Sequence, residues 1–448
     1  CEVAQANPDK DSALVSTSQH IVMMPTYVIL AATLTSWGFL GEASVSFITL
    51  GDWGGEALGG YHATDVKDVA AQMAKTAAAS SIKFVVNVGD NFYYCGIQNT
   101  SDYQINADYL GIYTASALQV PWYSALGNHE YGYNVDAQIE FTEADPSKRW
   151  YLPERYYTKR VELAVGQYAT FLVLDTNPCI QAYRASNPSG WDPCGSDFPT
   201  CSPIEEGACH FHENILSQNC GTQFEWMKEQ LSNVPKDDWF IVVAHHPADE
   251  IDVEDFLTPI QEHGFDIYLN GHVHTLQQYT VDNKGAYVCS GAGAMVKTAD
   301  QDNDKRCKNP EGSNTNSNAS SSGHTFQNVW TQKVAGFTLH TFSEDFKELK
   351  TEFISYTGEV LRSFSVTKGG TPSPTPTPPS PTPSPSPGGK CGGPGAYPCT
   401  SGCTYIHKSN EGACGVSKYG CYNCANLPSG CPDCNGTLFE NDETDFVV

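Results

Sequence analysis

The stretch that decides the fold runs from Lys83 to Tyr93 and reads Lys-Phe-Val-Val-Asn-Val-Gly-Asp-Asn-Phe-Tyr. Its β-branched and aromatic first half predicts a buried strand, and Gly89 ends that strand. Asp90 and Tyr93 therefore lie in the loop at the strand's carboxyl end, which is where open α/β sheets hold their ligands. We expect the functional site of the protein at this end of the sheet.

Four further strand-like runs end in the same way, each in a short loop of polar residues. These loops read Gly51-Asp52, Gly127-Asn128-His129-Glu130, His245-His246-Pro247 and Gly271-His272-Val273-His274. The ends of neighbouring strands meet at one edge of a sheet, so the five loops gather carboxylate, amide and imidazole donors in one place. Such oxygen and nitrogen donors predict a metal site. Any one motif alone would be an ordinary turn with a surface polar residue, but the complete ordered set favours the site.

The donor types indicate which metals would bind. The phenol of Tyr93 has a reference pKa near about 10, so it binds as phenolate only beside a strongly acidic cation, and a ferric ion suits it best. A carboxylate such as Asp90 can bridge two cations. Two metal ions roughly 3.5–4 Å apart stabilise the attacking and leaving oxygens of phosphoryl transfer, and a hydroxide between them is the expected nucleophile.

Strand-like and helix-like runs alternate from residue 44 to about residue 367, which favours an α/β fold with helices layered on sheets. A loop rich in Pro, Gly and Cys interrupts this alternation at residues 178–220. We expect helices over residues 64–79, 102–118, 223–231 and 253–263. Closing antiparallel strands are expected over residues 334–342, 348–356 and 359–367.

The 448 residues suffice for a full-sized core and an additional module. The formal net charge is −26 at pH 7, with 25 Lys and Arg against 51 Asp and Glu. Binding of nucleic acid requires Lys and Arg to face the phosphates. This balance therefore argues against a nucleic acid partner.

The 17 cysteines fall into two even groups and one isolated residue. Eight lie within residues 95–307, eight lie within residues 391–434, and Cys1 stands alone. Even groups predict disulfides formed in an oxidising compartment. The loop at 178–220 holds five cysteines, so at least one pairs outside the loop if all are oxidised. The candidate partners are Cys95, Cys289 and Cys307.

Other features agree with passage through the secretory pathway. Glycosylation triplets begin at Asn99, Asn318 and Asn435. Residues 1–43 form an N-terminal extension in which Met24 opens a candidate signal peptide, with an apolar segment over 27–40 before the cleavage site Gly41-Glu42-Ala43. The alternative is a signal anchor over residues 22–40. We expect a secreted glycoprotein, extracellular or in the lumen of an acidic secretory compartment.

The composition changes sharply after residue 368, where the main domain, residues 44–368, is expected to end. Residues 369–390 are rich in Pro, Thr and Ser and predict an extended linker. Residues 391–436 hold too few apolar side chains for a core, so cross-links must stabilise this Cys-rich module. Residues 437–448 form an acidic tail.

The Cys-rich module allows two interpretations of its chemistry and two of its role. The spacing of Cys421 with Cys424 and of Cys431 with Cys434 is typical of zinc sites, although disulfides are favoured in a secreted chain. The module is either a tether to a glycan, cell wall or matrix, or an inert and stable tail.

The ordered loop motifs resemble the metallophosphoesterase superfamily, and Tyr93 three residues after Asp90 narrows the resemblance to the purple acid phosphatases. Arg149-Trp150-Tyr151-Leu152-Pro153 and Tyr287-Val288-Cys289-Ser290-Gly291-Ala292-Gly293 are similar to the small, tartrate-resistant type. The match runs from about Phe47 to Val366. It implies an α/β fold built as a β-sandwich of two sheets flanked by helices, followed here by the small disulfide-rich C-terminal module.

The resemblance also implies a role for each donor. The implied ligands of a ferric ion are Asp52, Tyr93 and His274. The implied ligands of a divalent partner ion (iron, zinc or manganese) are Asn128, His245 and His272. Asp90 would bridge the two ions, and His129 would lie beside the substrate phosphate as the catalytic residue. Asn91 and His246 are further candidate contacts to the substrate.

Two positions depart from the small tartrate-resistant type. That type has a second substrate-site histidine in the loop after its His-x-Pro motif. The acidic residues that residues 247–257 offer in its place are Asp249, Glu250, Asp252, Glu254 and Asp255. Glu130 also replaces the Asp expected after Asn-His. These departures leave the identity of the general acid open.

The sequence as a whole favours a secreted acid phosphatase that hydrolyses small phosphomonoesters or phosphoproteins. A phosphodiesterase or pyrophosphohydrolase on the same metal core is the alternative among enzymes. A secreted matrix-binding protein with a vestigial phosphatase domain is the alternative of another class. The complete set of donors argues against this last alternative, because the loss of any one donor would suffice to silence the site.

Overall fold

The computed structural model describes residues 44–56, 60–185, 192–194, 209–294, 296 and 322–369, and the short strand segments 372–373, 403–406 and 420–423. All of these residues lie in one of two compact units, Ala43–Val448. The candidate signal peptide, the acidic tail, Asn318, Asn435 and most of the linker and Cys-rich module lie outside the described residues. Among the helices that the structure describes, none has the length and apolar character needed to cross a membrane.

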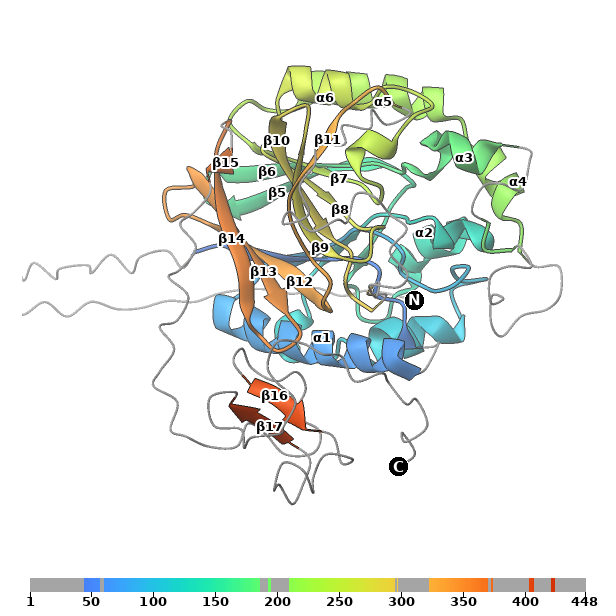
Figure 1. The fold of residues 1–448 in the computed structure, drawn as a ribbon. Coiled ribbons are helices and arrows are strands. Elements are labelled where there is room, and N and C mark those ends of the chain that lie inside the picture. The colour runs from blue at the N-terminus through green and yellow to red at the C-terminus, as the bar shows by residue number, and fades with distance from the viewer. Residues whose placement is uncertain are drawn as a thin grey trace, which may run out of the picture. The chain divides into compact units, whose positions relative to one another are not determined.

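The first of two large β-sheets has the strand order β15-β14-β13-β12-β1-β2-β3-β4. Figure 1 shows its strands β12, β13 and β14 side by side. Its strands are β1 (Ser46–Leu50), β2 (Phe84–Asn87), β3 (Trp122–Ser124), β4 (Trp150–Tyr151), β12 (Gly336–Phe342), β13 (Glu348–Ser355), β14 (Val360–Thr367) and β15 (Pro372–Ser373). The strands β1 to β4 run parallel. Each strand from β12 to β15 is antiparallel to its neighbours, which confirms the closing antiparallel strands expected from the sequence.

The second sheet has the strand order β11-β9-β10-β8-β7-β6-β5. Its strands are β5 (Tyr157–Ala164), β6 (Gln167–Val173), β7 (Trp239–Val243), β8 (Ile267–Asn270), β9 (Leu276–Val281), β10 (Lys284–Ser290) and β11 (Phe326–Gln332). The strands β6, β7, β8 and β10 run parallel, and β5, β9 and β11 are antiparallel to their neighbours.

The two sheets pack face to face through an aromatic core. Phe47 of β1 stacks on Phe84 of β2 with ring centroids 5.0 Å apart, and Phe171 of β6 meets the Phe84 ring edge-on at 5.5 Å. Trp239 of β7 meets Phe342 of β12 at 5.3 Å. Such edge-to-face pairs add stability beyond that of buried area alone. The β-sandwich predicted from the sequence is therefore confirmed.

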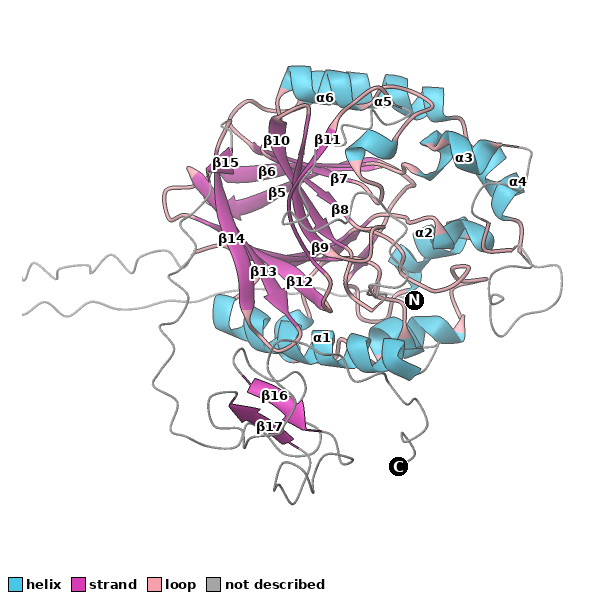
Figure 2. Cartoon of the chain, in the orientation of Figure 1, coloured by secondary structure: helices cyan, strands magenta, loops and turns pink. Residues whose placement is uncertain are grey.

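Helices cover the outer faces of both sheets (Figure 2). Helix α1 (Gly60–Ser80) contacts β1 and β12 of the first sheet. Helices α5 (Cys220–Asn233) and α6 (Leu257–His263) pack on the second sheet, where Met227 and Leu257 join Val242 and Tyr268 in a separate apolar cluster. The other α-helices of the described residues are α2 (Val135–Ala144), α3 (Gln181–Arg184) and α4 (Phe211–Leu216).

The prediction of a helix over residues 102–118 is wrong. The segment instead contains a π-helical turn at Ile105–Leu110 and a 3₁₀ turn at Ser116–Leu118. The ring of Tyr113 packs on Trp122 with centroids 4.8 Å apart, and both side chains are fully buried. Burial of these aromatic rings overrides the helical propensity of the segment.

The other expected helices are present, with shifted ends. The helices expected over 64–79 and 223–231 are confirmed as α1 and α5. Helix α6 begins at Leu257 rather than at residue 253. The N–H groups of Asp252 and Val253 both donate to the carbonyl of Cys179 (3.1 Å each), so this segment is bonded to the cysteine-rich loop before the helix begins.

Disulfides form in the cysteine-rich loop, as the sequence predicts. The bonds Cys179–Cys220 and Cys194–Cys209 both lie within this loop, and Cys95 is disulfide-bonded as well. Cys289 carries a thiol and not a disulfide, so its candidacy as a disulfide partner is wrong. It is buried in β10, and its Sγ lies 3.2 Å from the carbonyl oxygen of Gly271.

Candidate metal centre

The loops that follow β1, β2, β3, β7 and β8 come together between the two sheets. Within the first sheet, the N–H of Asp52 donates to the carbonyl of Gly89 (3.0 Å). Between the sheets, the N–H of Gly51 donates to the carbonyl of Ser290 in β10 (2.8 Å). The N–H of Gly271 donates to the carbonyl of His245 (3.0 Å) and so joins the loops after β7 and β8, and the N–H of His129 donates to Oδ1 of Asp90 (3.0 Å) and joins the loop after β3 to the loop after β2. The side chains of all seven predicted metal ligands meet among these loops.

A first group of donors surrounds the hydroxyl of Tyr93. The Tyr93 oxygen lies 3.2 Å from Oδ1 of Asp52, from Oδ2 of Asp90 and from Nε2 of His274. Nε2 of His274 is also 3.2 Å from Oδ1 of Asp52. Donor atoms spaced in this way can all face a single cation.

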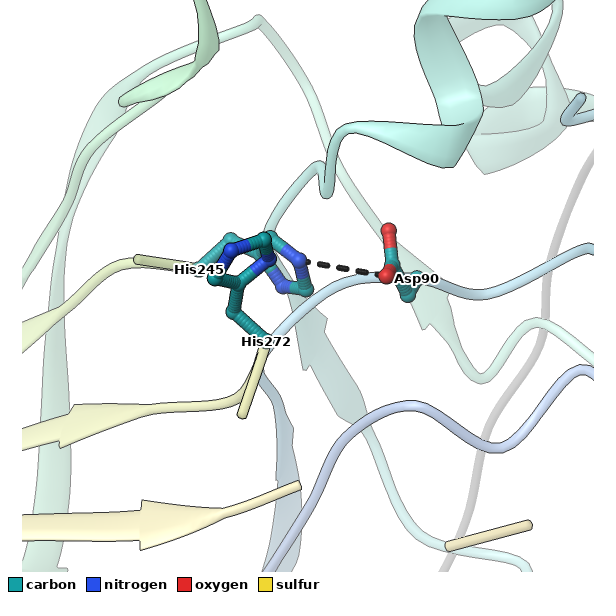
Figure 3. A group of neighbouring side chains, drawn as sticks. All are labelled: Asp90, His245 and His272. Carbon is teal, nitrogen blue, oxygen red and sulfur yellow. Dashed lines mark ion pairs between the residues drawn. The ribbon is translucent and has the colours of Figure 1, made fainter. Parts of the chain in front are cut away.

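A second group of donors surrounds the amide oxygen of Asn128. This oxygen lies 3.0 Å from Nε2 of His245 and 3.0 Å from Nδ1 of His272. Nε2 of His245 is 3.2 Å from Oδ2 of Asp90 (Figure 3). The same Asp90 oxygen therefore lies beside both groups, where it could bridge two ions.

Hydrogen bonds fix how the donors point. Nδ1 of His245 lies 2.8 Å from the carbonyl of Val88, so it carries the proton and leaves the Nε2 lone pair facing Asn128 and Asp90. The carboxylate of Asp52 accepts the backbone N–H of His272, with the shorter distance 3.0 Å to Oδ2. His245 and Asp52 are thus oriented by backbone partners within the protein.

Four of the seven predicted ligands have a left-handed backbone. Their φ angles are 57° for Asp52, 52° for Asp90, 70° for His272 and 56° for His274. Residues other than glycine rarely adopt this conformation, which costs of order 1–3 kcal/mol and concentrates at functional sites. The loop backbone is therefore shaped to aim these side chains rather than to minimise local strain.

The chemistry of the donor set suits a cation. Burial raises the pKa of the Tyr93 phenol well above its usual value, and the charges of Asp52 and Asp90 raise it further. Burial also raises the pKa of Asp52, although His274 opposes that shift. A phenolate beside two buried carboxylates needs positive charge nearby. Hard oxygen and imidazole donors without sulfur fit ions such as iron, zinc and manganese.

Glu130 stabilises the loops of the site and does not face a substrate. It is fully buried, and its carboxylate accepts four backbone N–H groups. The donors belong to Gly127, Asp90, Asn91 and Phe92. The carboxylate thereby ties the loop after β2 to the loop after β3. A group so enclosed does not reach a substrate, so Glu130 is excluded as the general acid.

His129 lies beside the two donor groups. Its backbone N–H donates to Oδ1 of Asp90 (3.0 Å), and its ring meets that of Tyr93 with centroids 4.3 Å apart. Nδ1 donates to the carbonyl of Tyr94 (2.6 Å), which leaves Nε2 facing Oδ2 of Asp90 at 3.8 Å. Burial lowers the pKa of His129 to about 4, although the charge of Asp90 opposes this shift.

Asn91 and His246, the two further candidate contacts, bond within the protein. The amide nitrogen of Asn91 donates to the carbonyl of Ala125 (3.1 Å) and to Oε1 of Gln138 (3.0 Å). His246 is fully buried. Its Nδ1 lies 2.8 Å from Oγ1 of Thr176, and its Nε2 lies 3.0 Å from the hydroxyl of Tyr183. Contact of either residue with a substrate stays a prediction.

Sequence reasoning missed two sets of contacts at the site. Thr176, which orients His246, follows β6, and no strand was expected there. Glu250 is, in the sequence, one of several acidic residues in the loop after Pro247, whereas in the structure its Oε2 lies 3.5 Å from Nε2 of His272. No spacing rule joins a loop glutamate to a histidine on another strand, so the sequence carries no signal for this contact.

Comparison with known proteins defines the class. Residues 45–276, more than half of the chain, match the family model described as calcineurin-like phosphoesterase. The chain therefore belongs to the calcineurin-like phosphoesterase family.

Within this family the chain is similar to purple acid phosphatases, as the resemblance in the sequence predicts. It is 29% identical to tartrate-resistant acid phosphatase type 5 of Oryctolagus cuniculus, over 62% of this chain and 83% of that relative. It is 30% identical to purple acid phosphatase 7 of Arabidopsis thaliana, over 57% of this chain and 72% of that relative.

A solved structure has a related fold at lower identity. GAP50, the anchor in the inner membrane complex of Plasmodium, superposes with a TM-score of 0.51 over 74% of this chain and 90% of that chain. The sequences are 18% identical, so this likeness concerns the fold alone.

Proposed function

We propose that this chain is an acid phosphatase that hydrolyses phosphomonoesters at a dinuclear centre of one ferric ion and one divalent ion. The observation that carries the proposal is the position of Asp90, whose Oδ2 lies 3.2 Å from both the Tyr93 hydroxyl and Nε2 of His245. The residues that would hold the ferric ion are Asp52, Tyr93 and His274. Those that would hold the divalent ion (iron, zinc or manganese) are Asn128, His245 and His272. The bound ions would supply positive charge to the attacking and leaving oxygens.

His129 is the residue of this chain placed to act on the substrate. Its ring is oriented by the carbonyl of Tyr94, and its Nε2 faces the shared carboxylate of Asp90. A phosphate held at the centre would meet this nitrogen. There His129 would either bind a phosphate oxygen or hold the proton that the leaving oxygen needs.

The test is metal analysis of the purified full chain together with a panel of substrates. The panel contains an alkyl phosphate, a nitrophenyl phosphate, a phosphodiester and pyrophosphate. We expect one iron and one further metal per chain, with the two monoesters hydrolysed fastest at acid pH. Faster turnover of the diester or of pyrophosphate would favour the alternative enzymes. A protein that holds both metals and turns over nothing would favour the vestigial phosphatase.

We also propose that the protein is a secreted glycoprotein. Two disulfides within the cysteine-rich loop support an oxidising compartment. Asn99 is exposed and so accessible to glycosylation. Expression in a secretory host should give a chain whose mass falls on Asn99→Gln by one glycan, and recovery of an unmodified chain from inside the cells would contradict the proposal.

The C-terminal region is proposed to act separately from the phosphatase. Residues 44–368 should then fold and hydrolyse nitrophenyl phosphate as the full chain does. Loss of binding to wall or matrix polysaccharide in this shorter chain, with unchanged turnover, would identify residues 391–436 as a tether. Loss of turnover would show that the Cys-rich module belongs to the catalytic unit.

A further inference from the structure

The two ring nitrogens of His272 face different partners. Nδ1 lies 3.0 Å from the amide oxygen of Asn128 and so belongs to the proposed divalent site. Nε2 lies 3.5 Å from Oε2 of Glu250, on the opposite side of the ring. The side chains of His272 and Glu250 are only 23% and 18% exposed, so water screens their interaction weakly.

Metal binding through Nδ1 would decide which nitrogen of His272 carries the proton. A histidine that binds a metal through Nδ1 must keep that nitrogen unprotonated, so its proton resides on Nε2. A carboxylate near Nε2–H favours this tautomer, fixes the plane of the ring and makes the other nitrogen a stronger ligand. Glu250 is the carboxylate that stands there.

The loop that carries Glu250 is held on both sides. Before the glutamate, the carbonyl of Asp249 accepts the hydroxyl of Ser322 (2.7 Å). After it, the N–H of Asp252 donates to the carbonyl of Cys179 (3.1 Å), and Asp255 lies 3.0 Å from Nε2 of His324. A carboxylate on such an anchored loop can hold a ligand in place.

We propose that Glu250 is a positioning residue of the metal centre, whose carboxylate faces Nε2–H of His272 and keeps Nδ1 facing the divalent ion. The proposal rests on the proposed function, since it assigns His272 to that ion. It also gives a role to the loop at residues 247–257, which lacks the second histidine of the small tartrate-resistant type. Loss of such an outer partner typically weakens metal binding by about 10–100-fold.

The test compares Zn²⁺ affinity in the full chain with the divalent site emptied and the ferric ion retained. Glu250→Ala should bind Zn²⁺ about 10–100-fold more weakly than the wild type, and Glu250→Gln should fall between them because its carbonyl still accepts one hydrogen bond. The ferric absorption should be unchanged, because Asp52, Tyr93 and His274 do not contact Glu250. Glu254→Gln, four residues along the same loop, is the matched control and should keep wild-type affinity.

Each other outcome overturns the proposal. Unchanged Zn²⁺ affinity with a raised KM would make Glu250 a substrate contact. The ligand atoms of His246, Glu250 and His272 lie within 4.8 Å of one another, so loss of a third metal ion in Glu250→Ala would make Glu250 a ligand instead. If Glu250→Gln and Glu250→Ala lost Zn²⁺ affinity to the same extent, and both also had a lower melting temperature, the role of Glu250 would be structural. A wild type without metal would instead contradict the proposed function itself.

Discussion

The hydroxyl of Tyr93 lies 3.2 Å from Oδ2 of Asp90. The phenol is therefore a direct neighbour of the carboxylate that lies beside both groups of donors. A neutral phenol could form this hydrogen bond without a metal. A ferric ion would convert it to phenolate, and the pair then becomes two ligands of one ion.

Tyr93→Phe should abolish the visible absorption of the oxidised protein, because phenolate-to-iron charge transfer requires the phenol oxygen. Iron binding should weaken by at least about 10-fold, as expected on removal of a ligand contact. Absorption spectra and metal analysis provide the measurement. Tyr103→Phe, at a side chain that is 46% exposed, should keep the colour. A colourless and fully active wild type that contains only zinc would refute the ferric assignment.

His129→Ala should slow hydrolysis of an alkyl phosphate by about 10²–10⁴-fold and that of a nitrophenyl phosphate far less. The alkoxide of an alkyl phosphate needs a proton to leave, whereas nitrophenolate leaves almost unaided. Steady-state kinetics on both substrates are compared at unchanged metal content. Equal losses on both substrates would mean that His129 only binds phosphate and that the proton comes from elsewhere.

Glu130→Gln should lower the free energy of unfolding by about 2–4 kcal/mol, because two of the four N–H groups that the carboxylate accepts lose their acceptor. Urea unfolding gives the value. Glu143→Gln, at an exposed site on α2, should change stability by less than about 0.5 kcal/mol. If the two variants proved equally stable, the carboxylate would not be the link between the two loops.

His324 should make stability depend on pH. Its Nδ1 lies 2.7 Å from Asp282 and its Nε2 lies 3.0 Å from Asp255. Burial lowers the pKa of His324, but the hydrogen bonds and charges of the two carboxylates outweigh burial and raise the pKa above its ordinary value. The stabilising contribution is therefore complete below pH about 6.5 and is lost as the pH rises through the raised pKa of the folded protein.

The measurement for His324 is the melting temperature of His324→Gln against pH. The deficit relative to the wild type should be largest near pH 5 and should vanish in alkaline solution. His263 provides the control, because burial lowers its pKa. Protonation of His263 therefore disfavours the folded protein, and His263→Gln should become more stable relative to the wild type as the pH falls. A deficit for His324→Gln that is constant from pH 5 to 9 would show that the charge of the ring contributes nothing.

The strands that end in the site are predictable because each is a short run rich in apolar residues that leads into a glycine or a predicted ligand. β2 and β7 are buried along their whole length, so every residue of the run is apolar or internally bonded. β5 alternates between buried and exposed residues and carries charges, so it was not recognised. The hairpin of β9 and β10 was missed as well, because only the end of β10 falls within a recognised motif.

Contacts between distant loops could not be predicted. The sequence indicated that Asp90 and His245 share a site, since both end strands of the same kind. It gave no indication that Glu250 faces His272 or that Tyr183 faces His246, because these contacts depend on how long loops fold back. The role of Glu130 was likewise hidden, since only the structure reveals its four backbone donors.

The donors divide by sheet and by element. The oxygen donors of Asp52, Asp90, Tyr93 and Asn128 follow strands of the first sheet, and the imidazoles of His245, His272 and His274 follow strands of the second. Either ion, once bound, would be held by oxygen from one sheet and nitrogen from the other. Metal binding is then a cross-link through the sandwich, and its free energy adds to that of the aromatic core. Removing the ions would leave the two halves of the molecule joined by packing and hydrogen bonds alone at the end where the chemistry takes place.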